Sequence, residues 1–200
     1  MVKPRFFKLL VAFGMVLGGF GAFYTLASSL PLFSSRDQFV AACREAGEQQ
    51  AAAMSSLGSK EEVMHMFELQ ADARYSRRNV QLPLAAMNII LSLLLFAGCT
   101  RALRGQMWGL SAWTLAALAS IPYTVLDVAF SIVQARDLSA AYRDLGTSVS
   151  MIFGSSLVLQ TLMSMMKATL ELLYFGTCLL YLRRPQITQL FSKSSPPAAH

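Results

Sequence analysis

The sequence predicts an all-α integral membrane protein: a four-helix bundle with an extramembrane helical hairpin between the first and second transmembrane helices. Three observations predict this fold. Hydrophobic residues make up 54% of the 200 residues, with a mean hydropathy of +0.47, which is too apolar for a water-soluble domain. Four stretches approach or exceed the roughly 20 apolar residues that cross a bilayer. Charged residues are segregated, because 13 of the 28 lie between Arg36 and Arg78.

The four apolar stretches cover residues 6–30, 80–103, 107–133 and 157–182. Three prolines lie near their ends, where a missing N–H group costs little. Pro31 follows the first stretch, Pro83 lies in the opening turn of the second, and Pro185 follows the fourth. Pro122 is inside the third stretch, so we expect it to kink that helix.

These features divide the chain into four parts. They are a basic segment with the first span (residues 1–35), a polar hairpin (36–79), the other three spans with short loops (80–184) and a disordered tail (185–200). A cleaved secretory signal is the alternative for the first span. Its apolar core of about 19 residues is longer than a usual signal core, so we favour a retained anchor.

The polar segment between the first two spans has the pattern of two helices. It contains helix-forming residues and one clear interruption at Gly58. Ser59 followed by Glu62 is a capping-box pattern that starts the second helix. Val63, Phe67 and Ala71 then lie on one face at helical spacing. We expect this helix to run directly into the second span, and the hairpin to form a solvated cap; a partner-docking surface is the alternative.

Polar residues form stripes inside the third and fourth spans. In the third span they follow one another at steps of four and three: Ser120, Thr124, Asp127, Ser131 and Gln134. In the fourth span the corresponding residues are Gln160, Ser164, Lys167 and Glu171, continued by Tyr174 and Cys178. Positions that face lipid hold such groups only at a high cost. We therefore expect the stripes to point at one another in the bundle.

Four residues are candidates for an intramembrane polar cluster: Asn88, Asp127, Lys167 and Glu171. With a rise of about 1.5 Å per residue, the first three reach a similar depth in their helices. We expect an ion pair between Asp127 and Lys167, with Glu171 either sharing Lys167 or kept neutral. One interpretation is that the cluster fastens helices together. The other is that it lines an ion or proton path with Glu171 as the titrating carboxyl group.

The first span carries small residues at every fourth position: Gly14, Gly18 and Ala22. This pattern is of the GxxxG type, which allows two helices to approach closely. We expect tight helix packing there, with a partner either within this chain or in another one.

Several function classes find little support in the sequence. The net charge of +6 is not concentrated on one face, which argues against nucleic-acid binding. Three cysteines without a CxxC pair and two histidines, His65 and His200, indicate no metal site. No nucleophile elbow, phosphate loop or dinucleotide fingerprint is present. We expect no enzymatic activity and no cofactor.

The sequence is therefore typical of a multi-pass protein that acts as a non-catalytic accessory, scaffold or assembly subunit of a membrane complex. The alternative is a small oligomeric channel or ion or proton carrier that uses Asp127, Lys167 and Glu171. The expected partners are the lipid bilayer and other membrane subunits or further copies of this chain. The expected location is a cell membrane, in particular the bacterial inner membrane, with both termini cytoplasmic because the basic cluster before the first span is dense.

Overall fold

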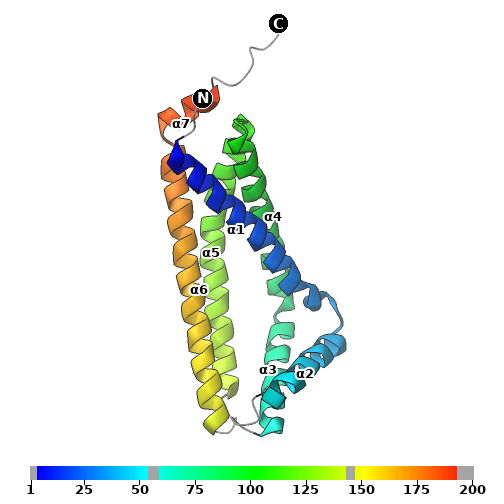
Figure 1. The fold of residues 1–200 in the computed structure, drawn as a ribbon. Coiled ribbons are helices and arrows are strands. Elements are labelled where there is room, and N and C mark those ends of the chain that lie inside the picture. The colour runs from blue at the N-terminus through cyan, green and yellow to red at the C-terminus, as the bar shows by residue number, and fades with distance from the viewer. Residues whose placement is uncertain (1–3, 54–58, 143–146, 193–200) are drawn as a thin grey trace. The chain divides into compact units, whose positions relative to one another are not determined.

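The computed structural model describes residues 4–53, 59–142 and 147–192, and every regular element among them is helical. In chain order these are α1 (Arg5–Ser29), the 3-10 helix η1 (Leu30–Phe33), α2 (Arg36–Ala53), α3 (Lys60–Ser76), α4 (Arg78–Leu103), α5 (Met107–Tyr142), α6 (Thr147–Leu182) and α7 (Pro185–Ser192) (Figure 1). Four segments are long and apolar enough to cross a membrane: Arg5–Phe33, Arg78–Leu103, Met107–Tyr142 and Gly154–Leu182. The predicted all-α four-helix membrane fold is confirmed.

Helices α5 and α6 are longer than the apolar stretches that marked them. Each has 36 residues, which corresponds to about 54 Å at 1.5 Å per residue. The hydrocarbon core of a bilayer is about 30 Å thick. Hydropathy reveals only the part of a helix that lies in lipid, so the polar turns after residue 133 and the residues before 157 were expected to be loop. They are largely helix.

The end of the chain also differs from the expectation. Residues 185–200 were predicted to be disordered, but Pro185–Ser192 form helix α7. Pro185 suits the first position of a helix, where no N–H group is needed. Ile187 and Phe191, one turn apart, are 3% and 2% exposed, and the ring of Phe191 lies 5.9 Å from that of Phe7. This tertiary contact stabilises a helix too short to form alone. Residues 193–200 lie outside the described part of the chain.

The structure divides into two compact units. The first unit contains Met1–Ser28, Ala85–Val125 and Ala168–His200, and the second contains Ser29–Leu84 and Leu126–Lys167. Each unit combines segments that are far apart in the sequence. Helices α4, α5 and α6 contribute one part to each unit.

Glycines bring the helices of the first unit into backbone contact. A Cβ atom on Gly18 of α1 would lie 2.6 Å from the carbonyl oxygen of Ser92 and 2.9 Å from the backbone nitrogen of Phe96, both on α4. A Cβ atom on Gly98 of α4 would lie 2.6 Å from the backbone nitrogen of Trp113 on α5. At Gly18, the close helix packing that the sequence predicts is therefore made within the chain, by α4.

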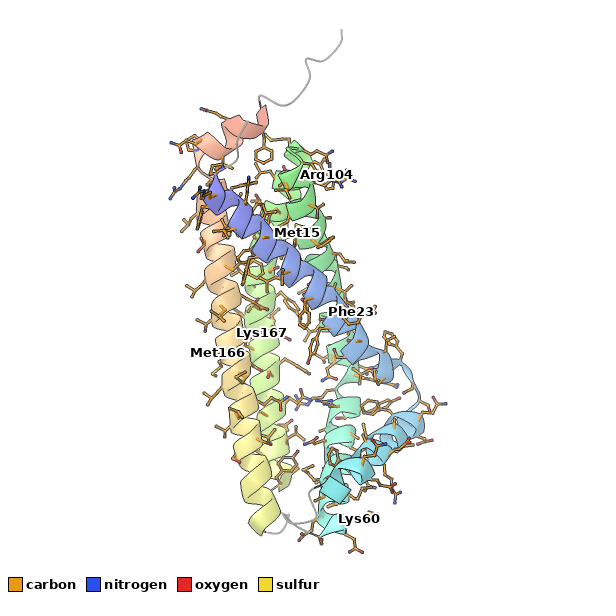
Figure 2. All side chains as sticks on the ribbon, viewed as in Figure 1. Met15, Phe23, Lys60, Arg104, Met166 and Lys167 are labelled. Atoms are coloured by element: carbon orange, nitrogen blue, oxygen red, sulfur yellow. The ribbon has the colours of Figure 1, made fainter. Side chains whose placement is uncertain are left out.

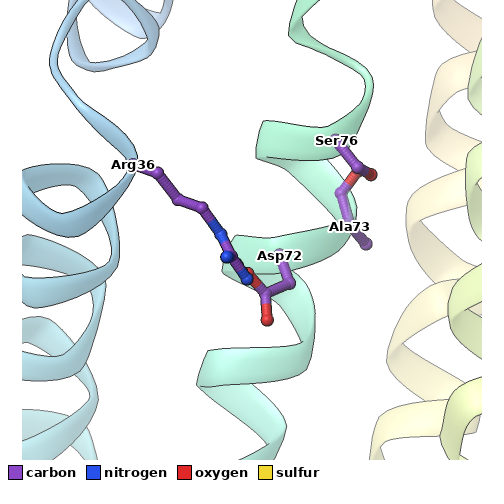
Figure 3. Close-up of polar contacts among 4 residues, drawn as sticks. All are labelled: Arg36, Asp72, Ala73 and Ser76. Atoms are coloured by element: carbon purple, nitrogen blue, oxygen red, sulfur yellow. The ribbon is translucent and has the colours of Figure 1, made fainter.

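The second unit contains the predicted helical hairpin. Ser59 and Glu62 form the capping box at the start of α3, and Val63 and Ala71 are 2% and 1% exposed. Arg36 of α2 forms an ion pair with Asp72 of α3, in which Nη2 of the arginine lies 2.8 Å from Oδ1 of the aspartate (Figure 3). This pair is exposed, so it adds little stability. The apolar face of α3 holds the hairpin together.

Helix α3 is also attached to the end of α5. The side-chain nitrogen of Gln70 donates a hydrogen bond of 2.6 Å to the Tyr142 hydroxyl, and Arg77 forms an ion pair with Asp137. Met66 of α3 is buried in one cluster with Leu138, Tyr142 and Leu157. Helix α3 ends at Ser76 and α4 begins at Arg78, so the predicted continuation into the second span is interrupted by Arg77 alone. The hairpin is thereby held against helices that are themselves candidate spans.

Replacing Gly18 with Ile should destabilise the protein by about 3 kcal/mol, because the added side chain meets backbone atoms that cannot rotate away. The measurement is the free energy of unfolding in mixed detergent micelles. Gly176→Ile is the matched control, since a Cβ atom there has nothing within 4 Å, and it should change the stability by about 0.5 kcal/mol or less. Equal losses in the two variants would contradict the close contact of α1 with α4.

Candidate functional site

The four residues of the expected polar cluster are divided between the two units. Asn88 and Glu171 belong to the first unit, whereas Asp127 and Lys167 belong to the second. The hydrogen-bond partners and the exposure of each residue within its own unit differ in part from those that the sequence predicts.

Asn88 connects α4 to α1. Its side-chain nitrogen donates a hydrogen bond of 2.7 Å to the Thr25 hydroxyl, and its side-chain oxygen accepts a bond of 3.4 Å from the Ser92 hydroxyl. Thr25 was missed as a partner. Its position offered a signal, because it follows Ala22 by three residues and so continues the line of small residues along α1. Lipid offers no water to these polar groups, so the hydrogen bond between the two helices satisfies them instead.

Glu171 is half-buried on α6 and faces α5. Its carboxylate oxygen accepts a hydrogen bond of 3.4 Å from the Thr124 hydroxyl. Thr124 and Ser120 are 3% and 5% exposed, so this part of the α5 stripe points inward as predicted. Glu171 is the one acidic residue in the sequence of the first unit. The unit thus has a half-buried carboxyl group beside a buried hydroxyl group.

The polar stripe of α6 does not face inward along its whole length. Tyr174 and Cys178 are 7% and 0% exposed, whereas Gln160 and Lys167 are exposed. The prediction of a single inward stripe is wrong for these two residues. Gln160 and Cys178 are 18 residues, or five turns, apart and so lie on the same side of a straight helix. Their burial differs because different residues pack against the two parts of α6: Tyr174 and Cys178 belong to the first unit, and Gln160 and Lys167 to the second.

Asp127 is half-buried on α5, and Lys167 is exposed on α6. The pairing of Asp127 with Lys167 stays a prediction. Ion pairs of the second unit include Arg36 with Asp72, Arg44 with Glu68, and Arg77 with Asp137. The α3–α5 contact through Arg77 was missed because it depends on the polar extension of α5, which hydropathy does not reveal.

Sulfur and aromatic side chains form the centre of the first unit. Cys99, Cys178 and Trp113 are each 0% exposed. The Tyr174 hydroxyl donates a hydrogen bond of 3.0 Å to the carbonyl oxygen of Leu10, and Gly14 leaves the space that this hydroxyl occupies. Among the described residues, no group of three or more His, Cys, Asp or Glu side chains is placed to hold a metal ion. These buried groups act as packing elements.

Comparison of the chain with models of known protein families, with curated protein sequences and with solved structures gives no match. The geometry of the chain itself is therefore the basis for its proposed function.

The Asn88–Thr25 bond should appear as a coupling in a double-mutant cycle. Asn88→Ala and Thr25→Val should each destabilise the protein, and the double variant should lose less than the sum. Polar bonds between membrane helices give couplings of about 0.6 kcal/mol on average and up to about 2 kcal/mol. Unfolding in mixed micelles measures all three variants, and strictly additive losses would show that the bond contributes nothing.

Proposed function

We propose that this chain is a non-catalytic accessory, scaffold or assembly subunit of a membrane complex. The observation that carries the proposal is the attachment of the polar hairpin to α5. The Gln70–Tyr142 hydrogen bond joins α3 to the end of α5, and the Arg77–Asp137 ion pair joins the residue after α3 to the same helix. Met66 of α3 is buried in one cluster with Leu138, Tyr142 and Leu157. A hairpin fixed in this way presents a surface of defined shape to a partner.

Helix α2 supplies the exposed face of that hairpin. Its exposed residues are small, polar or charged: Arg36, Asp37, Gln38, Ala41, Ala42, Arg44, Glu45, Ala46, Glu48 and Gln49. Small side chains allow a partner helix to approach closely, and carboxylates add selectivity through charge. The face has no exposed large apolar residue among these positions, which suits a subunit that meets its partner through polar contacts.

A second candidate function is a small oligomeric channel or an ion or proton carrier. The hydrogen bond between Thr124 and Glu171 supports it, because ionisable residues inside a membrane span often serve transport. Four helices alone leave little room for an aqueous lumen, so this function requires several copies of the chain. Asp127 and Lys167 remain proposed members of the same polar path.

The charge distribution supports an orientation with both termini in the cytoplasm. The two units contain nearly equal numbers of Lys and Arg residues, eight and nine. The orientation therefore depends on the dense cluster of Lys3, Arg5 and Lys8 at the first span, which usually dominates. Basic residues accumulate on the cytoplasmic side of membrane proteins. The basic groups of the first unit lie beside the N-terminus, the α4–α5 turn and the end of α6. A cell membrane, specifically the bacterial inner membrane, remains the proposed location.

Gentle extraction from the native membrane should yield a particle in which this chain is bound to unrelated chains in a fixed ratio. Native mass spectrometry of that particle measures its mass and composition. A closed particle that contains several copies of this chain and no other protein would contradict the accessory role and favour the channel or carrier. A solitary monomer would contradict both candidate functions.

Cys43 of α2 should report the orientation. Burial raises the pKa of its thiol above the ordinary value of 9.0, and the nearby Arg74 only partly offsets this. Because the thiolate is the reactive form, labelling by a membrane-impermeant maleimide should be slow at pH 7 and still accelerate above pH 9. Cys99 and Cys178 are 0% exposed and should stay unlabelled.

In intact cells the reagent should reach Cys43 from outside, and a faster-reacting Ala42→Cys variant provides the exposed control. Labelling of both positions only after the membrane is opened would reverse the proposed orientation.

A further inference from the structure

Basic side chains gather where four helices of the first unit begin or end. One buried apolar cluster packs the start of α1, the end of α4, the start of α5 and the end of α6 together; it includes Phe7, Ala102, Leu110 and Leu182. Arg104 lies just after the end of α4 (Figure 2). The exposed or half-buried cations within two residues of this cluster are here called the basic rim: Arg5, Lys8, Arg101, Arg104, Arg183 and Arg184.

The basic rim lies at the depth of the lipid headgroups. The candidate membrane spans begin or end at Arg5, Leu103, Met107 and Leu182. Each residue of the rim is within three residues of one of these ends, which corresponds to about 5 Å of helix rise. The headgroup layer on each side of the hydrocarbon core is about 5 to 8 Å thick. The six cations are therefore within reach of lipid phosphate groups.

The first unit offers the basic rim almost no negative charge of its own. Glu171 is the one acidic residue in the sequence of this unit. It precedes Arg183 by twelve residues, or about 18 Å of helix rise, and it accepts a hydrogen bond from Thr124. In the second unit, by contrast, Arg36 and Arg77 form ion pairs with carboxylates. A ligand that carries negative charge would complement the rim.

Aromatic rings orient two arginines of the rim. The guanidinium group of Arg184 lies 5.6 Å from the centre of the Tyr181 ring, and that ring meets Phe6 edge-on at 5.0 Å. The guanidinium group of Arg101 lies 5.5 Å from the centre of the Trp108 ring. A guanidinium group on an aromatic ring keeps N–H groups at its edge, where two of them can bind one phosphate. Phe6 and Trp108, 47% and 52% exposed, present apolar surface beside these cations.

An anionic phospholipid matches the charge, the depth and the exposed rings together. Clusters of basic residues beside membrane spans attract the headgroups of such lipids. Inorganic phosphate would match the charge alone, because it has no acyl chain to cover Phe6 or Trp108. An acidic protein segment would have to enter the headgroup layer, where lipid phosphates are already concentrated.

We propose that the basic rim binds an anionic phospholipid, with guanidinium groups of the rim on the headgroup phosphate and with Phe6 and Trp108 against the acyl chains. The inference goes beyond the proposed function and does not depend on it, since an accessory subunit and a channel could both hold such a lipid.

The test titrates the purified full-length chain in a neutral detergent with phosphatidylglycerol or phosphatidylcholine, and native mass spectrometry measures the bound lipid. Phosphatidylglycerol should bind about tenfold more tightly or better. One basic residue near an anionic membrane surface contributes about fivefold to binding, so the double variant Arg183→Gln with Arg184→Gln should weaken phosphatidylglycerol binding by about tenfold or more.

The matched control removes two exposed cations of the second unit, Lys60→Gln with Arg136→Gln. It should change the affinity by about twofold or less, because these residues lie outside the basic rim. The melting temperature of each variant in the same detergent shows whether it folds.

Tryptophan fluorescence locates the lipid on the protein. The chain has two tryptophans, and Trp113 is 0% exposed, so Trp108 is the one that lipid reaches. Phosphatidylglycerol with brominated acyl chains should quench this emission more strongly than brominated phosphatidylcholine at the same mole fraction. Arg101→Gln with Arg104→Gln should remove the difference.

Three results would overturn the inference. The first is equal affinity for the two lipids, and the second is unchanged phosphatidylglycerol binding in the folded variant that lacks Arg183 and Arg184. The third is displacement of the lipid by a competitor in excess: inorganic phosphate would assign the rim to a soluble anion, and polyglutamate would assign it to an acidic protein segment.

Discussion

The packing of this protein depends on the close approach of helix backbones in a solvent that offers no hydrophobic driving force. Lipid chains are as apolar as leucine, so shape complementarity and polar bonds must hold helices together. Gly18 lets α1 approach the backbone of α4, and Gly98 lets α4 approach that of α5. Once these backbones touch, the buried side chains of Trp113 and Cys99 have fixed surroundings. The remaining contacts of the first unit build on this arrangement.

The polar residues within the spans divide into two kinds. Asn88 and Glu171 form hydrogen bonds with hydroxyl groups of neighbouring helices. These bonds offset the free-energy cost of placing the two polar side chains in lipid. Gln160 and Lys167 are instead exposed on α6. The first kind contributes to the specificity of the bundle, because a polar group within a span is stabilised by a polar partner on a neighbouring helix.

The second unit shows how a polar segment gains a defined position. The exposed pair of Arg36 and Asp72 contributes little, because water screens both groups. Burial of Met66 with Tyr142, together with the hydrogen bond from Gln70, carries more of the stability. The long α5 is essential here, since its last turns provide the surface on which α3 packs.

The sequence by itself determined the four spans, the hairpin with its Ser59 capping box, and the close packing along Gly14 and Gly18, because each depends on hydropathy or on local spacing. It did not determine the length of α5 and α6 beyond the apolar residues, the folding of α7 on Phe7, or which half of the α6 stripe faces inward. Those features depend on contacts between residues far apart in the chain. Hydropathy records what lipid tolerates at each position, whereas only the tertiary structure decided whether a polar side chain such as Lys167 faces a neighbouring helix or the surface.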